Sequence, residues 1–251
     1  MRLAAFVVTG VLPLPAAAQL AVDQAEVFLD PRTPGRGVVS FTVTNEGDRV
    51  TEAAIYLGDW DRRENGEHRF LPSGTLPRSC ARYVRVFPLA LRLPARASQA
   101  VRIGLEGADS LAAACWSVIF VESRGPQKSG GRQISYVTRI GVKVYVVPPG
   151  LPKDGEVTDM AVRQTGRREV EVAFENTGGV PLWVHGSIEF RRPDNSVAAS
   201  DTLPEFPVLP GAVRRVQASL PRLARGRYLA LALLDFGGAE VAAGQVQVEA
   251  P

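Results

Sequence analysis

Short runs of alternating or β-branched residues recur along almost the whole chain, and turn-forming residues separate them. The turn signals include Asn45–Asp48 and Gly130-Gly131 in the first half and Asn176–Gly179 in the second. Only Ala108–Ala114 suggests a helical turn. Strands at this spacing are typical of β-sandwiches, because each strand needs one apolar face and a tight turn at its end. We therefore expect an all-β protein.

The expected strands form two sets. The first set is Leu20–Leu29, Val38–Thr44, Ala53–Trp60, Ala81–Phe87, Ala100–Leu105, Trp116–Val121 and Ile134–Val147. The second set is Val157–Arg163, Glu169–Glu175, Leu182–Phe190, Val197–Leu203, Ala212–Leu220, Tyr228–Leu234 and Val241–Val248. The stretch between the sets is rich in proline, which cannot donate ladder hydrogen bonds and stays extended. About seven strands on each side predict two Ig-like β-sandwich domains, 19–147 and 156–251, joined by a Pro-rich linker at 148–155. One larger sandwich or barrel is the alternative.

The first residues have the pattern of an export signal. Met1-Arg2 is a minimal positive region, Leu3–Leu14 is apolar, and Pro15–Ala18 offers a small-residue cleavage site. The apolar run is too short and too interrupted by proline to span about 30 Å of hydrocarbon. We expect 1–18 to be a secretory signal peptide, with a buried N-terminal strand as the alternative. No later stretch approaches about 18 uninterrupted apolar residues, so we expect no membrane insertion.

Composition and motifs exclude several classes of function. The 251 residues are 45% hydrophobic and 22% charged, which excludes a disordered or collagen-like chain. A formal net charge of +3 is too small to indicate nucleic-acid binding. The sequence contains no G-x-S-x-G elbow, no phosphate-binding glycine loop and no H-E-x-x-H zinc motif. We expect no enzyme, no cofactor and no metal site.

The cysteines Cys80 and Cys115 are an even pair in a chain that we expect to be exported. Disulfides persist in oxidising compartments, so a structural disulfide is favoured over two free thiols. Closing a loop of about 35 residues would stabilise the fold by roughly 3–4 kcal/mol in the chain-entropy model. The histidines, His68 and His185, lie far apart and do not complete a metal site with these cysteines.

The strongest local feature is the run that precedes the proline-rich stretch. Its alternate positions are Ile134, Tyr136, Thr138, Ile140, Val142, Val144 and Val146. A usual strand has about 5–6 residues, so this one is too long for a single sandwich face. The segment Ser123–Arg132 before it is expected to be a mobile, basic loop. An exposed apolar edge needs a partner to cover it, and adding a strand from that partner is its physical use. An ordinary last strand packed inside its own domain is the alternative.

Several stretches occur in the order and spacing of one known family. They are Phe41–Asp48, Val86–Pro94, Gln99–Ile103, Ile140–Pro148, Asn176–Leu182 and Leu234–Gly238. Together with the long strand and the export signal, they resemble the PapD-like periplasmic pilus-assembly chaperones. The resemblance implies a periplasmic protein that lends its last first-domain strand to a pilin-like subunit, which an outer-membrane usher then assembles. A secreted two-domain Ig-like adhesive or structural module is the alternative. A dimer whose copies cap each other through the strand fits either function.

The resemblance also assigns site residues. The strand lent to the subunit would present Ile134, Tyr136, Thr138, Ile140 and Val142. The family's lysine, which anchors the subunit's C-terminal carboxylate, falls on Lys143, five residues before Pro148 and one of only three lysines. The family's first-strand arginine falls near Glu26, which has the opposite charge. Either the register differs, or Arg139 or Arg32 takes its place, or the anchor is weakened.

An ion pair between the domains is a further expectation from the resemblance. Asp235 stands at the position of one partner of that ion pair. At the positions where its other charged partners are expected, this chain has Cys115 and Val147. The expected disulfide would replace part of that stability.

Overall fold

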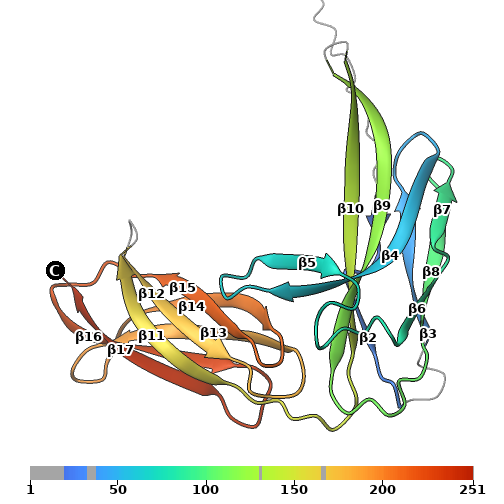
Figure 1. Cartoon of the computed structure of the whole chain (residues 1–251). Coiled ribbons are helices and arrows are strands. Elements are labelled where there is room, and N and C mark those ends of the chain that lie inside the picture. Colours follow the sequence, from blue (N-terminus) through green and yellow to red (C-terminus); the bar gives the residue numbers. More distant parts are fainter. Residues whose placement is uncertain (1–19, 33–37, 130–131, 165–167, 251) are drawn as a thin grey trace, which may run out of the picture.

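The computed structural model describes residues 20–32, 38–129, 132–164 and 168–250, and for 126–129 and 132–134 only the backbone. The expected signal peptide, 1–18, lies outside the described residues. Within these ranges no helix is long and apolar enough to cross a membrane. Figure 1 shows two β-sheet bodies, one built from the first part of the chain and one from the last. The expectation of an all-β fold with two sandwiches is therefore confirmed.

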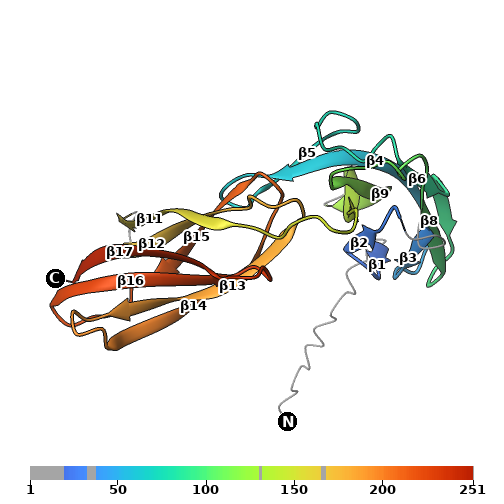
Figure 2. The ribbon, with the colours of Figure 1, turned by 90° about the horizontal axis from the view of Figure 1, so that it is seen from below.

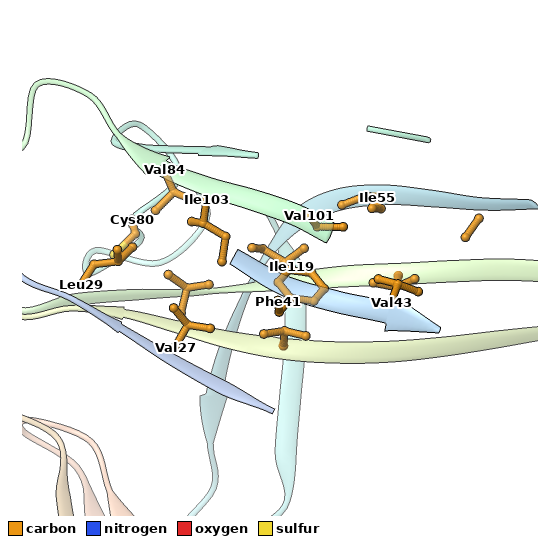
Figure 3. Close-up of a cluster of buried hydrophobic side chains, with 14 of the residues drawn as sticks. Val27, Leu29, Phe41, Val43, Ile55, Cys80, Val84, Val101, Ile103 and Ile119 are labelled. Carbon is orange, nitrogen blue, oxygen red and sulfur yellow. The ribbon is translucent and has the colours of Figure 1, made fainter. Parts of the chain in front are cut away.

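The first body consists of two sheets. One has the order β1 (Leu20–Val22), β3 (Val38–Asn45), β8 (Ser98–Leu105) and β6 (Val84–Phe87). The other has the order β2 (Glu26–Leu29), β10 (Arg132–Val146), β9 (Cys115–Ser129), β4 (Thr51–Arg62) and β5 (His68–Pro72), and β7 (Ala90–Leu93) also pairs with β4. Alternate residues of both sheets point inward and form the core shown in Figure 3. Phe41, Val101 and Ile119 are fully buried there.

The second body repeats this design. One sheet is β11 (Glu156–Gln164), β12 (Arg168–Glu175) and β15 (Val213–Ser219). The other is β14 (Val197–Val208), β13 (Leu182–Arg191), β16 (Gly226–Asp235) and β17 (Ala242–Ala250). Each strand that the sequence predicts in this half is present, and Figure 2 shows these sheets from a second side. The proline-rich stretch 147–155 carries no strand.

A buried asparagine occupies the same kind of turn in both bodies. The Asn45 side-chain amide donates to the carbonyls of Leu93 and Pro94, and its oxygen accepts from the Gly47 N–H. Asn176 donates to the Val208 carbonyl and accepts from the Gly178 N–H. Both side chains are fully buried, so these bonds satisfy polar groups that would otherwise be costly.

Three local expectations are wrong. Leu20–Leu29 is not one strand, because β1 pairs with β3 whereas β2 pairs with β10 in the other sheet. The chain turns at Asp23, whose carboxylate accepts the Thr42 N–H at 2.7 Å in place of a continued ladder. Ala108–Ala114 is a non-helical turn, and strands β5 and β7 are additional to the expected set.

The expected mobile loop Ser123–Arg132 is also wrong. Strand β9 continues to Ser129 and pairs with β10 residue by residue, from Val146↔Cys115 to Arg132↔Ser129. Its glycine, proline and serine suggested a turn, but cross-strand pairing overrides weak local propensity. In Figure 1 the hairpin of β9 and β10 rises past the other strands of the first body.

Candidate functional site

Strand β10 has two halves with different neighbours. Its whole length pairs with β9, but on the other side β2 covers only Lys143–Val146, in parallel register. Among the described residues no strand pairs with the other side of Arg132–Val142. We call this the free edge.

The hydrogen-bonding direction of the free edge follows from β2. Both main-chain groups of a strand residue point to the same side, and the side alternates along the chain. Lys143 and Val147 donate their N–H groups toward β2, to the carbonyls of Ala25 and Leu29. The free edge therefore presents the N–H and C=O groups of the residues with the same parity, which are Ser135, Val137, Arg139 and Gly141.

The side chains of β10 also alternate. Val142, Val144 and Val146 are fully buried in the first core. Ile140 packs against that core, and Tyr136 and Thr138 continue its row half-exposed. The side chain of Ile134 lies outside those described, although its backbone pairs with Gln127. The row of apolar side chains thus runs past the end of the sandwich.

The hairpin accommodates Tyr136 through a glycine on the neighbouring strand. Gly125 of β9 lies directly opposite Tyr136. A Cβ atom at Gly125 would lie 2.6 Å from Oη of Tyr136. The ring therefore lies over bare backbone, which a larger residue at this position would not allow without moving the ring.

Arg139 lies on the opposite face of β10 and is held there by Glu122. Its Nη2 is 2.9 Å from Oε2 of Glu122, which also accepts from the Tyr56 hydroxyl at 2.6 Å. The hydrogen bond from Tyr56 has the larger effect and the one from Arg139 the next, and both hold the pKa of Glu122 below its usual value. In this structure Arg139 is thus paired with Glu122.

Lys143 and Glu26 form a half-buried ion pair near the C-terminal end of β10. They are direct Cα partners in the parallel register, and Nζ lies 2.9 Å from Oε1. The side chains are 19% and 27% exposed, and Nζ also lies 5.1 Å from the Trp60 ring centroid. The residue opposite Lys143 is therefore the acid Glu26, near which the resemblance led us to expect an arginine. Arg32 is exposed beyond the end of β2.

An aromatic cluster at the domain junction was not foreseen. It lies on the outer face of the six-stranded sheet and contains Trp60, Trp116, Val118, Phe120 and Tyr145, with Leu209 from the second body. Phe28, although 51% exposed, stacks on Tyr145 at 4.8 Å and meets Trp183 of the second body edge-on at 5.4 Å. Burial, followed by the charge of Glu26, raises the pKa of the Tyr145 hydroxyl, which therefore stays protonated. This cluster packs the two bodies together.

The predicted disulfide is present. Cys80 and Cys115 are bonded with a Cα–Cα distance of 5.2 Å, and both are buried. Cys115 is the first residue of β9 and lies opposite Val146. The bond therefore fixes the end of the hairpin at which Cys115 pairs with Val146.

The charged contact between the bodies differs from the expected one. Asp235 lies 3.8 Å from His185 on the neighbouring strand of its own sheet. Between the bodies, the Glu64 carboxylate in the β4–β5 turn pairs with the Arg215 guanidinium of β15 at 2.8 Å, and the Glu64 backbone carbonyl accepts the Arg215 N–H at 2.8 Å. No three His, Cys, Asp or Glu side chains of the described ranges come together as metal ligands.

Comparisons with known proteins agree with this geometry at the level of the fold. No family model matches the sequence, and no curated protein matches it. A chain from the chaperone–tip adhesin complex of CFA/I fimbriae biogenesis is similar over 93% of this chain and 100% of its own, with a TM-score of 0.52 and 13% identity. The class 5 fimbriae chaperone CfaA is similar over the same shares, with a TM-score of 0.50 and 13% identity.

The chain has the fold of the PapD-like pilus chaperones. At 13% identity it is a divergent example of that fold.

Proposed function

We propose that this protein is a periplasmic chaperone that binds pilin-like subunits by donating the Ile134–Val142 segment of β10, for assembly by an outer-membrane usher. The observation that carries the proposal is the free edge. Within the described ranges, one side of this hairpin carries a row of main-chain donors and acceptors that no strand pairs with, next to half-exposed side chains. Such an edge is an aggregation hazard unless a partner strand covers it.

Strand donation uses both features of β10. A subunit that lacks one strand would pair its own edge with the N–H and C=O groups of Ser135, Val137, Arg139 and Gly141. Tyr136, Thr138 and Ile140, with Ile134, would fill the groove that the missing strand leaves in the subunit core. Folding of the subunit would then be driven by burial of these side chains, so the reaction requires no nucleotide.

The other expectations fit this function. The expected signal peptide over 1–18 would deliver the protein to the periplasm, where the Cys80–Cys115 bond is stable. Lys143 lies where the donated segment enters the sandwich, and it would hold an anionic group of the subunit in competition with Glu26.

The test is affinity purification of the tagged protein from its native periplasm, with a matched pair of variants. Tyr136→Arg places a charge in the donated row, whereas Val137→Arg places the same charge on the opposite, 54% exposed face of the strand. We expect the parent and Val137→Arg to retain a small secreted β-protein in a one-to-one ratio, and Tyr136→Arg to lose it. Unfolding curves of all three should agree, since neither side chain belongs to the core.

Equal capture by Tyr136→Arg would contradict strand donation. Recovery of the chain alone, or of ligands that ignore β10, would favour the secreted Ig-like binding module instead. An equilibrium dimer that Tyr136→Arg dissociates would indicate self-capping through the same edge.

A further inference from the structure

A cavity of about 640 Å³ lies beside the disulfide of the first body. Two segments far apart in the sequence form its walls, residues 74–83 between β5 and β6 and residues 110–115 at the start of β9. The Cys80–Cys115 bond joins the two segments. Cys115 pairs with Val146, at the end of β10 that lies away from the free edge. The cavity is therefore separate from the segment that we propose to be donated.

The walls of the cavity are mainly apolar. Leu76, Pro77 and Leu111 contribute aliphatic surface, and residues 112–114 are all alanine. Small-molecule sites are typically cavities of about 300–1,000 Å³ with apolar walls and a small number of polar groups. The cavity thus has the size and the surface for a ligand with an apolar body.

The charged residues that line the cavity are two arginines, Arg78 and Arg82, and none of the described lining residues is acidic. Arg78 is half-buried, its Nη1 donates to the Ala114 carbonyl at 3.3 Å, and its Cζ lies 5.9 Å from the Trp116 ring centroid. Cζ of Arg82 lies 4.5 Å from the ring centroid of Tyr83. Since a guanidinium has five N–H donors, each arginine keeps most of its donors for a ligand.

Carboxylates near these arginines do not neutralise them. Arg85, three residues after Arg82, is paired with Glu106 at 2.7 Å. Within the described ranges neither Arg78 nor Arg82 forms such an ion pair. Asp109 precedes a lining residue but does not itself line the cavity. An anion in the cavity would therefore gain charge-assisted hydrogen bonds, which are shorter and stronger than neutral ones.

The wall that carries Arg78 is fixed by a buried carboxylate. Asp59 of β4 is fully buried, and its two oxygens accept the Leu76 N–H at 2.8 Å and the Ser79 hydroxyl at 2.6 Å. The Arg78 carbonyl accepts the Trp116 N–H at 3.0 Å, which ties the two walls together. With the disulfide, these bonds form the cavity before a ligand arrives, and a preformed site lowers the entropy that binding costs.

We propose that this cavity binds a small amphipathic anion, with its carboxylate or phosphate head at Arg78 and Arg82 and its apolar body against Leu76, Leu111 and the alanines. The apolar walls and the two arginines together favour this class of ligand over a neutral apolar molecule or a small inorganic anion. The site stands on its own geometry and goes beyond the proposed chaperone function.

The first test is isothermal titration of the purified protein with octanoate, octyl phosphate, 1-octanol and acetate, at one ionic strength and below micelle-forming concentrations. We expect saturable one-to-one binding of an octyl anion, and much weaker binding of 1-octanol and acetate. Binding of either octyl anion supports the site, and the tighter of the two identifies the head group. Equal binding of 1-octanol or of acetate would overturn the ligand class, and no binding of either octyl anion would overturn the proposal.

Variants then locate the site. Arg82→Gln, an exposed change, and Arg78→Gln should each weaken binding of the octyl anion about tenfold or more, the loss expected for one charge-assisted hydrogen bond. Ala113→Trp should abolish binding by filling the cavity, and Ala113 is exposed, so the fold should persist. Arg85→Gln is the matched control, because Arg85 is already paired with Glu106, and it should bind as the parent does. Unchanged binding by Arg82→Gln and Ala113→Trp would overturn the proposal.

The free edge is the competing site for an apolar anion, and Tyr136→Arg separates the two. We expect Tyr136→Arg to bind the octyl anion as the parent does, and Ala113→Trp to capture the subunit as the parent does. Loss of the octyl anion in Tyr136→Arg but not in Ala113→Trp would place the ligand on β10 and overturn the cavity as its site. Failure of subunit capture in the parent, with octyl-anion binding that depends on Arg82, would support the cavity and contradict the chaperone function alone.

Discussion

The two halves of β10 share one alternating pattern but have opposite surroundings. In the lower half, Lys143–Val146, β2 and β9 flank the strand and the inward side chains are fully buried. In the upper half, Arg132–Val142, β9 is the only one of the described strands that pairs with β10, and most of the described side chains of the same parity are half-exposed. The difference arises because β2 spans only Glu26–Leu29. A strand can thus be structural at one end and available to a partner at the other.

The largest effect on stability should come from removing the disulfide beside the lower half of β10. Replacing both Cys80 and Cys115 with serine removes a cross-link over 35 residues. We expect the free energy of unfolding in urea to fall by roughly 3–4 kcal/mol. Subunit capture at low temperature should persist, because the free edge does not depend on the bond. A loss well under 1 kcal/mol would show that the disulfide is unimportant for the lower half.

Truncating one side chain in each half should give unequal losses. Val144→Ala opens a cavity in the core and should lower the free energy of unfolding by about 2–3 kcal/mol. Thr138→Ala, six residues earlier on the same face, should change it by less than about 0.5 kcal/mol. Urea unfolding of both variants provides the measurement. Equal losses would mean that the upper half is packed as firmly as the lower half.

The ion pairs of the two halves should differ in the same direction, with smaller effects. Lys143→Ala leaves a half-buried Glu26 without its cation, and we expect a loss of about 1 kcal/mol in unfolding free energy. Arg139→Ala removes an exposed contact from Glu122, which keeps Tyr56 and Arg124, so the urea midpoint should shift less than for Lys143→Ala. A larger shift for Arg139→Ala would reverse the comparison.

The sequence could predict those parts of the site that follow from local pattern. Alternation identified β10 and the parity of its apolar row. Spacing from Pro148 put Lys143 on this strand and the resemblance put Glu26 on the first strand, and the structure pairs these two residues. The paired cysteines indicated the disulfide, and the turn signals at Asn45 and Asn176 coincide with turns in the structure.

Other parts depend on contacts distant in the sequence. Ser123–Ser129 has the composition of a turn and becomes a strand only because β10 lies beside it. Trp60, Phe120 and Tyr145 have the parity of an outer sheet face, which a single sandwich would expose, but Leu209 and the rest of the second body cover it. Arg62 at the end of β4 is half-buried, and it lies near the charge of Glu26, which comes from the first strands of the chain.

Residue-resolved hydrogen exchange of β10, with and without the captured subunit, tests the central claim most directly. In the free protein we expect fast exchange for the amides of Ser135, Val137, Arg139 and Gly141, and slow exchange for those of Lys143 and Val147, which are bonded to β2. Subunit binding should protect the first set and leave the second unchanged. If the first set is already protected in the free monomer, or stays unprotected in the complex, the free edge is not where the subunit binds.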